Sequence, residues 1–546
     1  MSSSSQEKHE KVPIEDEASP GSILSTTPES EPTLREYIRL AALCRSREKE
    51  GDTVVPENAV PGILERSGVD KEELLAAQRA LRTATWISVF YLITTDILGP
   101  FNAPFAFSQV GYVPGTILYV VMGAVACYTG LILSHLFCKL DSVQYPVRTY
   151  ADLGGRILGN WFKHLCTALQ SLQLIVNVGT ICLSNGQAVE QLAANHKICF
   201  SIAIVIWAFV GMIIGQIRTL KNYGWLANSA VWLNLLIIFT SMGFVAHSPP
   251  NFASAQASFG VEPGPVMTSA FVSLPLFAKV NGIMNMVFAY GGAMIFPEFM
   301  AEMRRPMDFW KGMVCAQLLI STVYLLYGIF VYSFQGQFTL GLAFQGVSKQ
   351  SWQDVGNVLA LITGIIAAGL YGNIGITYCI EVAYYQIVEG WLKGPPFMSR
   401  RGKMLWPIVV VLYWSLAFIV GSAIPQVQTI SGLIAAICIM QFTYTFPPLL
   451  LLGYQIRVFA EGYGDHVATR NPNEPRDDDP GDTWRNLSRW KRGLFGGGNG
   501  YFNLFNLILF LGSASMACLG MYGSGTSIRE TFKHGAATSF GCKSPV

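Results

Sequence analysis

Charged residues are scarce in this sequence. Asp, Glu, Lys and Arg make up only 13% of its 546 residues, whereas a soluble domain usually carries about 25%. Hydrophobic residues make up 51%, and the mean hydropathy is +0.38. This balance excludes an ordinary soluble domain and favours an integral membrane protein in a lipid bilayer. No nucleic-acid partner is expected.

Motifs for metal binding and catalysis are also lacking. The 11 cysteines form no CxxC pair and no Cys/His cluster with metal-ligand spacing, which excludes a zinc site and a thioredoxin-like motif. Most of them stand inside apolar runs, where cysteine usually acts as a small hydrophobic residue. Ser, His and Asp are not grouped at credible positions for catalysis. We therefore expect neither an enzyme nor a protein with a bound cofactor.

The first 82 residues are polar and contain no signal peptide. Their composition predicts disorder to about residue 32. Helical spacing then appears in "PTLREYIRLAALCRSREKE" and "DKEELLAAQRALR". The simpler interpretation is a solvated tail. The alternative is a regulatory arm, in which the serines, Lys8 and Lys11 are modified or regulatory partners bind.

Apolar runs long enough to cross a bilayer follow this tail. A spanning helix needs about 20 mostly apolar residues. The runs predict an all-α membrane protein with eleven transmembrane helices, near 83–106, 115–138, 164–187, 199–217, 224–246, 281–298, 312–334, 354–388, 405–424, 426–453 and 502–523.

Basic residues predict the orientation of these helices. All but six of the 37 Lys and Arg residues fall on the side of the N-terminal tail, and none lies inside a predicted span. The six exceptions are Lys197, Lys279, Lys349, Arg529, Lys533 and Lys543. Because basic loops stay in the cytoplasm, we expect a cytoplasmic N-terminus and an extracellular C-terminus.

The first and sixth predicted helices contain residues that break helices. The first carries Gly99 and Pro100 in "TTDILGPFNAP", and the sixth carries Gly291 and Gly292 in "NMVFAYGGAMIFPEF". An unsatisfied backbone group in hydrocarbon costs several kcal/mol, so such breaks persist where they face a protein-lined cavity. The breaks stand five helices apart, as in transporters built from two inverted five-helix repeats. The alternative is a pair of packing kinks.

The predicted spans and the two five-helix repeats together divide the chain into six parts. They are a cytoplasmic tail (1–82), a first repeat of helices 1–5 (83–246), a second repeat of helices 6–10 (281–453), a cytoplasmic loop (454–501), helix 11 (502–523) and an extracellular tail (524–546).

A zwitterionic amino acid suits two broken helices. N-termini of half-helices attract its carboxylate, and exposed carbonyl groups hold its ammonium group. We predict that the backbone at both breaks and the aromatic side chains beside them form the substrate site. The predicted residues are Leu98, Gly99, Phe101, Asn102, Ala103, Phe288, Ala289, Tyr290, Gly291 and Gly292.

Carboxylates within membrane spans are candidates for carrying a proton, because a charge in the bilayer is costly. Asp96, Glu298 and Glu381 are the candidates. Asp96 could instead cap the second half of the first helix. For Glu298, a gate or a helix-end ion pair with Arg304 or Arg305 is favoured over proton transfer.

Three ordered motifs resemble those of the amino acid/auxin permease family. "ILGPFNAPFAFSQVGYVPG" is similar to the family's first-helix signature, "PVRTYADLGGRILG" to its loop after helix 2, and "FAYGGAMIFPEFMAEMRRPMDF" to helix 6 and the following loop. The resemblance covers roughly residues 80–525. Within the family it is strongest to fungal neutral amino acid permeases of the N-system or Mtr type.

The resemblance implies a LeuT-like fold with discontinuous helices 1 and 6. It also implies symport of neutral aliphatic and aromatic amino acids across the plasma membrane, driven by the proton gradient alone. A sensor on the same fold, which would signal through the tail, remains an alternative, as does sodium coupling. A sodium site would need hydroxyl groups on span 8, where Thr377 stands alone.

Overall fold

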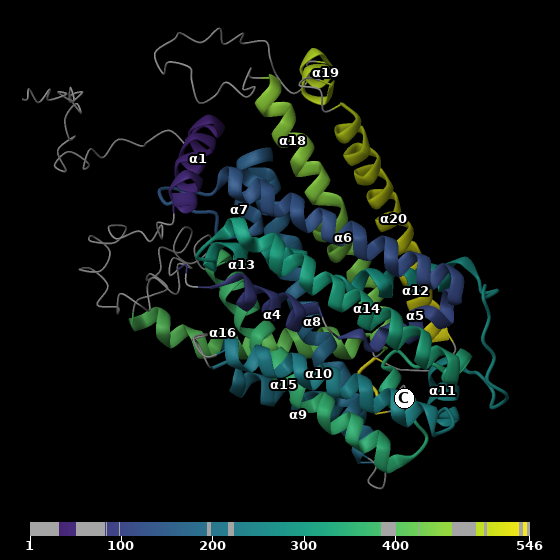
Figure 1. The fold of residues 1–546 in the computed structure, drawn as a ribbon. Coiled ribbons are helices and arrows are strands. Elements are labelled where there is room, and N and C mark those ends of the chain that lie inside the picture. Colours follow the sequence, from purple (N-terminus) through teal and green to yellow (C-terminus); the bar gives the residue numbers. More distant parts are fainter. Residues whose placement is uncertain are drawn as a thin grey trace, which may run out of the picture.

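Helices make up all the regular structure in the described part of the chain (Figure 1). The computed structural model describes residues 32–50, 82, 84–97, 99–193, 198–216, 223–383, 400–424, 426–460, 487–495, 500–533 and 539–542. Within these ranges, β-pairing is limited to two isolated bridges, Ala84 with Met303 and Pro250 with Val347.

The order of elements follows the predicted spans. The main helices are α1 (Leu34–Glu50), α4 (Trp86–Ile97), α5 (Ala103–Val110), α6 (Tyr112–Leu140), α7 (Tyr150–Leu158), α8 (Asn160–Leu192), α9 (Phe200–Ile214), α10 (Tyr223–Ala246), α11 (Phe252–Phe259), α12 (Leu276–Ala289), α13 (Phe296–Glu302), α14 (Phe309–Gln335), α15 (Gln350–Ala383), α16 (Arg400–Ala423), α17 (Val427–Ile434), α18 (Phe446–Ala460), α19 (Leu487–Phe495) and α20 (Gly500–Lys533).

Nine helical segments among the described residues are long and apolar enough to cross a bilayer. Each lies at the position of a predicted span. The two remaining predictions, 83–106 and 199–217, correspond to the shorter apolar helices Trp86–Thr95 and Phe200–Ile214. The protein is therefore an all-helical, multi-pass membrane protein.

The last predicted span is longer than expected, and part of the N-terminal tail is helical as predicted. The helix predicted over 502–523 extends from Gly500 to Lys533, so the predicted C-terminal tail begins inside it. The first helical stretch of the N-terminal tail forms α1. The second stretch, 70–82, lies almost wholly outside the described residues, as do residues 1–31.

Glycine makes the sharp corner between α5 and α6. Gly111 has a φ of +95°, which side-chain-bearing residues rarely adopt. A Cβ atom there would stand 2.6 Å from the Ala270 carbonyl oxygen. The corner therefore needs glycine both for its backbone angle and for the close approach of the loop after α11.

Buried apolar residues form two clusters. The larger draws mainly on α4–α7, α12–α14 and α18, and the smaller on α8, α9, α16 and α17. Phe101, Leu169 and Phe288 pack against both clusters. The seam between the clusters therefore passes the broken parts of the first and sixth predicted helices.

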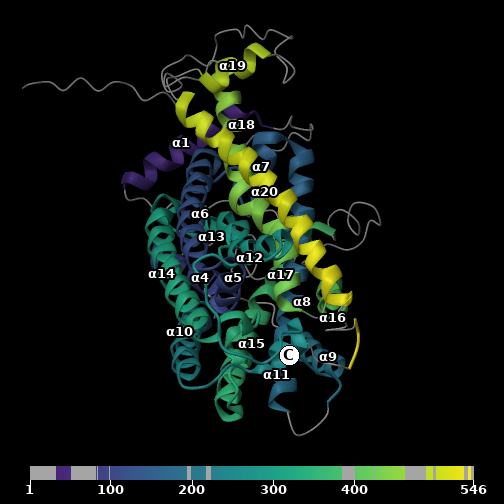
Figure 2. The same ribbon diagram turned by 90° about the vertical axis from the view of Figure 1, so that its right-hand side faces the viewer.

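Large apolar side chains remain exposed on the outer faces of the long helices. They include Phe209, Ile213, Phe239, Leu318, Leu412 and Ile508. Exposed apolar surface of this extent marks contact with a membrane. Figures 1 and 2 place α1, α7 and α19 toward one end of the molecule, and α11 with the C-terminal end of the chain toward the other.

A disulfide fixes the C-terminal segment at the α11 end. Cys199, just before α9, is bonded to Cys542 across a sequence separation of 343 residues. The Ser201 hydroxyl donates to the Gly541 carbonyl at 2.7 Å, and the Phe540 amide donates to the Ser422 carbonyl at 3.2 Å. The end of the chain is thereby held against α9 and α16.

Candidate functional site

The first predicted span is interrupted in its middle. Helix α4 ends at Ile97, a 3-10 turn covers Pro100–Asn102, and α5 starts at Ala103. Gly99 is exposed, and none of the described atoms lies within 4 Å of the place where its Cβ would stand. Leu98 lies outside the described residues. Among the described residues, nothing packs against Gly99 at this break.

The sixth predicted span is interrupted at its two glycines. Helix α12 ends at Ala289, and a 3-10 turn over Ala293–Ile295 leads into α13. The Tyr324 hydroxyl donates to the Ala289 carbonyl at 2.9 Å, which satisfies one backbone group freed by the break. A Cβ on Gly291 would stand 2.8 Å from an Ile439 side-chain carbon and 2.9 Å from the Phe288 carbonyl oxygen. This break is tightly packed.

The first break lies against α12, about one turn before the second break. The Asn102 amide donates to Asn285 Oδ1 at 3.2 Å. The Asn285 amide in turn donates to the carbonyl groups of Asn281 at 2.8 Å and Gln428 at 3.0 Å. Asn285 is fully buried, so this hydrogen-bonded group holds the first break against α12 and the start of α17.

Tyrosines surround the break of the sixth span. Tyr119 of α6 and Tyr324 of α14 both make edge contacts with Tyr290. The Tyr290 hydroxyl donates to the Tyr119 carbonyl at 3.0 Å. The Tyr119 hydroxyl is buried and has no hydrogen-bond partner among the described residues. Since an unpaired buried hydroxyl is costly, this group marks a place for a polar ligand or water beside the break.

Glu298 lies on the α1 side of the break. It is buried in α13 and accepts a hydrogen bond from Gln170 of α8 at 2.9 Å. Gln170 also donates to the Met294 carbonyl at 3.4 Å. Arg304 and Arg305, its predicted ionic partners, are exposed. The described geometry thus connects Glu298 to α8, the helix that packs against both core clusters.

Tyr150 stands near Glu298 at the start of α7. Burial, together with the nearby Cys166 and Glu298, raises the pKa of Tyr150 well above its ordinary value. The phenol therefore keeps its proton and donates to the Phe442 carbonyl at 3.3 Å. This bond ties α7 to the segment that precedes α18.

The other two candidate carboxylates occupy helix ends. Asp96 is in the last turn of α4, directly before the first break, and Glu381 is near the end of α15. Their side chains, and that of Thr377, lie outside the described part of the structure.

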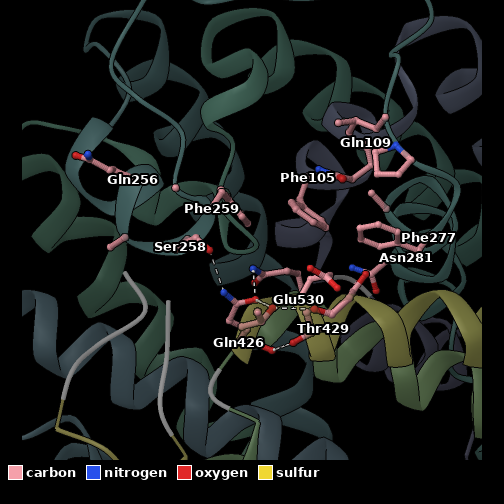
Figure 3. Close-up of a pocket in the computed structure, with 18 of the residues that line it drawn as sticks. Phe105, Gln109, Gln256, Ser258, Phe259, Phe277, Asn281, Gln426, Thr429 and Glu530 are labelled. Atoms are coloured by element: carbon pink, nitrogen blue, oxygen red, sulfur yellow. Dashed lines mark hydrogen bonds between the residues drawn. The ribbon is translucent and has the colours of Figure 1, made fainter. Parts of the chain in front are cut away.

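A cavity of about 680 Å³ lies beside α11 (Figure 3). Phe105 and Phe277 form part of its wall, with Gln428 and Glu530 from α17 and α20. Asn281 also lines it. Asn281 stands one helical turn before Asn285, whose amide donates to the Asn281 backbone carbonyl and whose Oδ1 accepts from Asn102, so the cavity wall and the first break are neighbours along α12.

The sequence-based prediction missed Asn281 and Asn285. The two residues stand four apart in the otherwise apolar "VNGIMNMV", and this spacing places them on one face of a helix. Polar residues in a membrane span usually face a protein interior or a cavity. The spacing of these two asparagines is therefore a signal in the sequence that could have indicated the site.

Two interrupted spans close to the seam between two cores, in a multi-pass membrane fold, are typical of a transporter. The sequence profile of the family described as "Transmembrane amino acid transporter protein" matches residues 82–457. The chain belongs to this family.

Three similar proteins have names that describe transporters. The "N amino acid transport system protein" of Neurospora crassa is 25% identical over 374 residues, which cover 67% of this chain and 74% of the relative. A "Transmembrane transporter" of Gibberella moniliformis is 24% identical, covering 71% and 80%. "Auxin transporter protein 1" of Arabidopsis thaliana is 23% identical, covering 63% and 68%.

Proposed function

We propose that this protein is a secondary active transporter that carries neutral aliphatic and aromatic amino acids into the cell together with protons. The observation that carries the proposal is the Asn102–Asn285 hydrogen bond, which holds the first helix break against α12 about one turn before the second break. Interrupted helices in transporters present backbone groups to the substrate, and an amino acid offers both charges that such groups bind.

The substrate backbone binds at the two breaks. The start of α5 attracts the carboxylate, since the first N–H groups of a helix are unpaired and carry a partial positive charge. Carbonyl groups over 98–101 and 289–292 hold the ammonium group. The half-buried rings of Phe101 and Phe288 form the walls against which an apolar side chain packs.

Asp96 carries the proton in this proposal. It precedes the first break by one turn, so protonation would neutralise a carboxylate beside the bound ammonium group and lower the cost of moving this segment through a low-dielectric environment. Glu298 and Glu381 are the next candidates. The alternative role of Asp96 is to cap the following half-helix.

The chain would cross the plasma membrane eleven times, as two inverted repeats of five helices plus helix 11. Its N-terminus would be cytoplasmic and its C-terminus extracellular. The Cys199–Cys542 disulfide supports this orientation, because disulfides persist outside the reducing cytosol. An epitope after Val546 should be reached by antibody on intact cells, and an epitope at Ser2 should not; the reverse pattern would overturn the topology.

A sensor on the same fold is the second candidate, because α1 of the predicted cytoplasmic tail is an ordered helix. Accumulation separates the two functions. A transporter concentrates labelled amino acid inside sealed vesicles, whereas a pure sensor binds it without accumulation. A panel of unlabelled competitors then gives the substrate range, and uptake without sodium decides between proton and sodium coupling.

A further inference from the structure

Helix α1 packs along α6 at the end of the molecule opposite the cavity (Figures 1 and 2). Only three of its 17 residues are buried: Leu34, Ala41 and Glu48. Leu34 belongs to the larger core cluster. A helix that buries so little of its surface can detach at a lower cost than an element of the core.

The main polar anchor of α1 is Asp141, directly after α6. Its side chain is fully buried. Arg45 of α1 donates to one of its carboxylate oxygens at 2.9 Å, and Arg82 donates to both at 3.1 Å. The Val147 amide adds a bond at 3.1 Å. One carboxylate thus joins α1, the segment before α4 and the loop after α6.

Glu48 adds a connection to the segment before α14. It pairs with Arg45 at 2.6 Å and accepts a hydrogen bond from the Met307 amide at 3.2 Å. Nearby, the Arg304 amide donates to the Ala84 carbonyl at 2.9 Å. The segments that precede α4 and follow α13 are therefore fastened together beside α1.

A third contact lies near the start of α1. The guanidinium group of Arg156 stands over the Tyr37 ring, 4.4 Å from its centroid. The ring also makes an edge contact with Tyr145. Both partners lie between α6 and α8, so this contact extends the attachment of α1 to the loop that carries α7.

These contacts join the ends of both broken spans on one side, whereas the cavity lies on the other. We propose that α1 is a latch that keeps the α1 end of the transport path closed and must detach before substrate leaves there. The α1 latch consists of Arg45 and Glu48 with their partners Arg82, Asp141 and Met307. The proposal rests on the proposed transport function.

Buried ion pairs suit a contact that must open and close better than one that is permanent. The desolvation of their charges offsets much of the attraction while they are intact, yet loss of one partner leaves an uncompensated buried charge. The intact ion pairs therefore add little net stability, whereas a single substitution that removes one partner strongly destabilises the contact. Arg45 is the residue to change, because it bonds to both Asp141 and Glu48.

Cys138 is a free, partly buried cysteine one turn before Asp141 and lies near Arg45 and Glu48, so its labelling should rise when the α1 latch opens. The full-length Arg45→Ala variant would be treated with a hydrophilic maleimide, and labelling of Cys138 would be followed by mass spectrometry. Release of preloaded substrate from proteoliposomes would be measured in parallel. Arg45→Ala should raise both rates by about tenfold or more, since it removes one partner of a buried pair.

Arg47→Ala is the matched control, because Arg47 is exposed on the same helix; both of its rates should equal those of the wild type. Arg45→Lys, which keeps the charge, should give intermediate rates and serves if Arg45→Ala does not fold. Unchanged labelling would overturn the proposal, and so would faster labelling with unchanged release. A wild-type chain that transports nothing would overturn the proposed function, while Cys138 labelling would still test whether α1 closes this end.

Discussion

The two helix breaks differ in how tightly they are packed. At the second break, the Ala289 carbonyl is held by Tyr324, and Gly291 has no room for a side chain. At the first break, Gly99 is exposed, and no described residue lies within 4 Å of its would-be Cβ. The difference indicates that the backbone of the second break is held in a fixed position. The first break has the space to move and carries Asp96.

The largest effect should come from filling the tight break. Gly291→Val places a branched side chain against Ile439 and the Phe288 carbonyl, so uptake should be abolished. Gly243→Val is the matched control and should retain most of the activity, because this glycine of α10 is exposed and no described atom lies within 4 Å of its would-be Cβ. Labelled amino acid uptake, normalised to surface expression, measures both. Normal uptake by Gly291→Val would refute the placement of the site.

Asp96→Asn tests whether the open break couples transport to protons. The amide keeps most of the capping ability of the carboxylate but cannot titrate. The variant should bind substrate and exchange it, yet lose accumulation driven by a pH gradient. Accumulation with the wild-type pH dependence would assign the proton to another group, with Glu298 examined next by Glu298→Gln.

Asn102→Ala tests the link between the breaks. It leaves Asn285 Oδ1 without its Asn102 donor, and an unsatisfied buried acceptor costs about 1–3 kcal/mol. Uptake should fall by about tenfold, and the melting temperature of the purified protein should decrease. A double-mutant cycle with Asn285→Ala should show strong coupling between the two changes. Additive effects would mean that this hydrogen bond does not join the breaks.

Tyr324→Phe should have the smallest effect. It removes the hydrogen bond to the Ala289 carbonyl and keeps the ring, which at about 1 kcal/mol corresponds to roughly a fivefold rise in KM. Tyr112→Phe is the control, because among the described residues its hydroxyl bonds to Ser333 on an exposed surface. Equal KM values for the two variants would contradict the role of Tyr324 in positioning the Ala289 carbonyl for substrate binding.

Local sequence signals predicted much of the membrane region. Length and apolarity predicted the long helices because a bilayer imposes both. Gly99–Pro100 and Gly291–Gly292 predicted the interruptions because these residues weaken a helix wherever they stand. Helical spacing also predicted α1, since its apolar residues recur at the period of a helix.

Partners distant in the sequence could not be predicted in the same way. Cys199 and Cys542 are 343 residues apart, and nothing local to either residue selects the other. Tyr324 supports Ala289 only because α14 packs beside α12. Likewise, Asp141 resembles an ordinary solvated loop residue until α1 folds back onto it. Each of these contacts depends on the tertiary fold rather than on local propensity.

Proton movement during transport tests the central claim most directly. Purified protein would be sealed into sodium-free vesicles that contain a pH-sensitive dye, and a neutral amino acid would be added outside. Proton-coupled symport predicts acidification of the lumen that depends on the amino acid and is absent with Gly291→Val. Accumulation of the amino acid without any change in lumenal pH would contradict it.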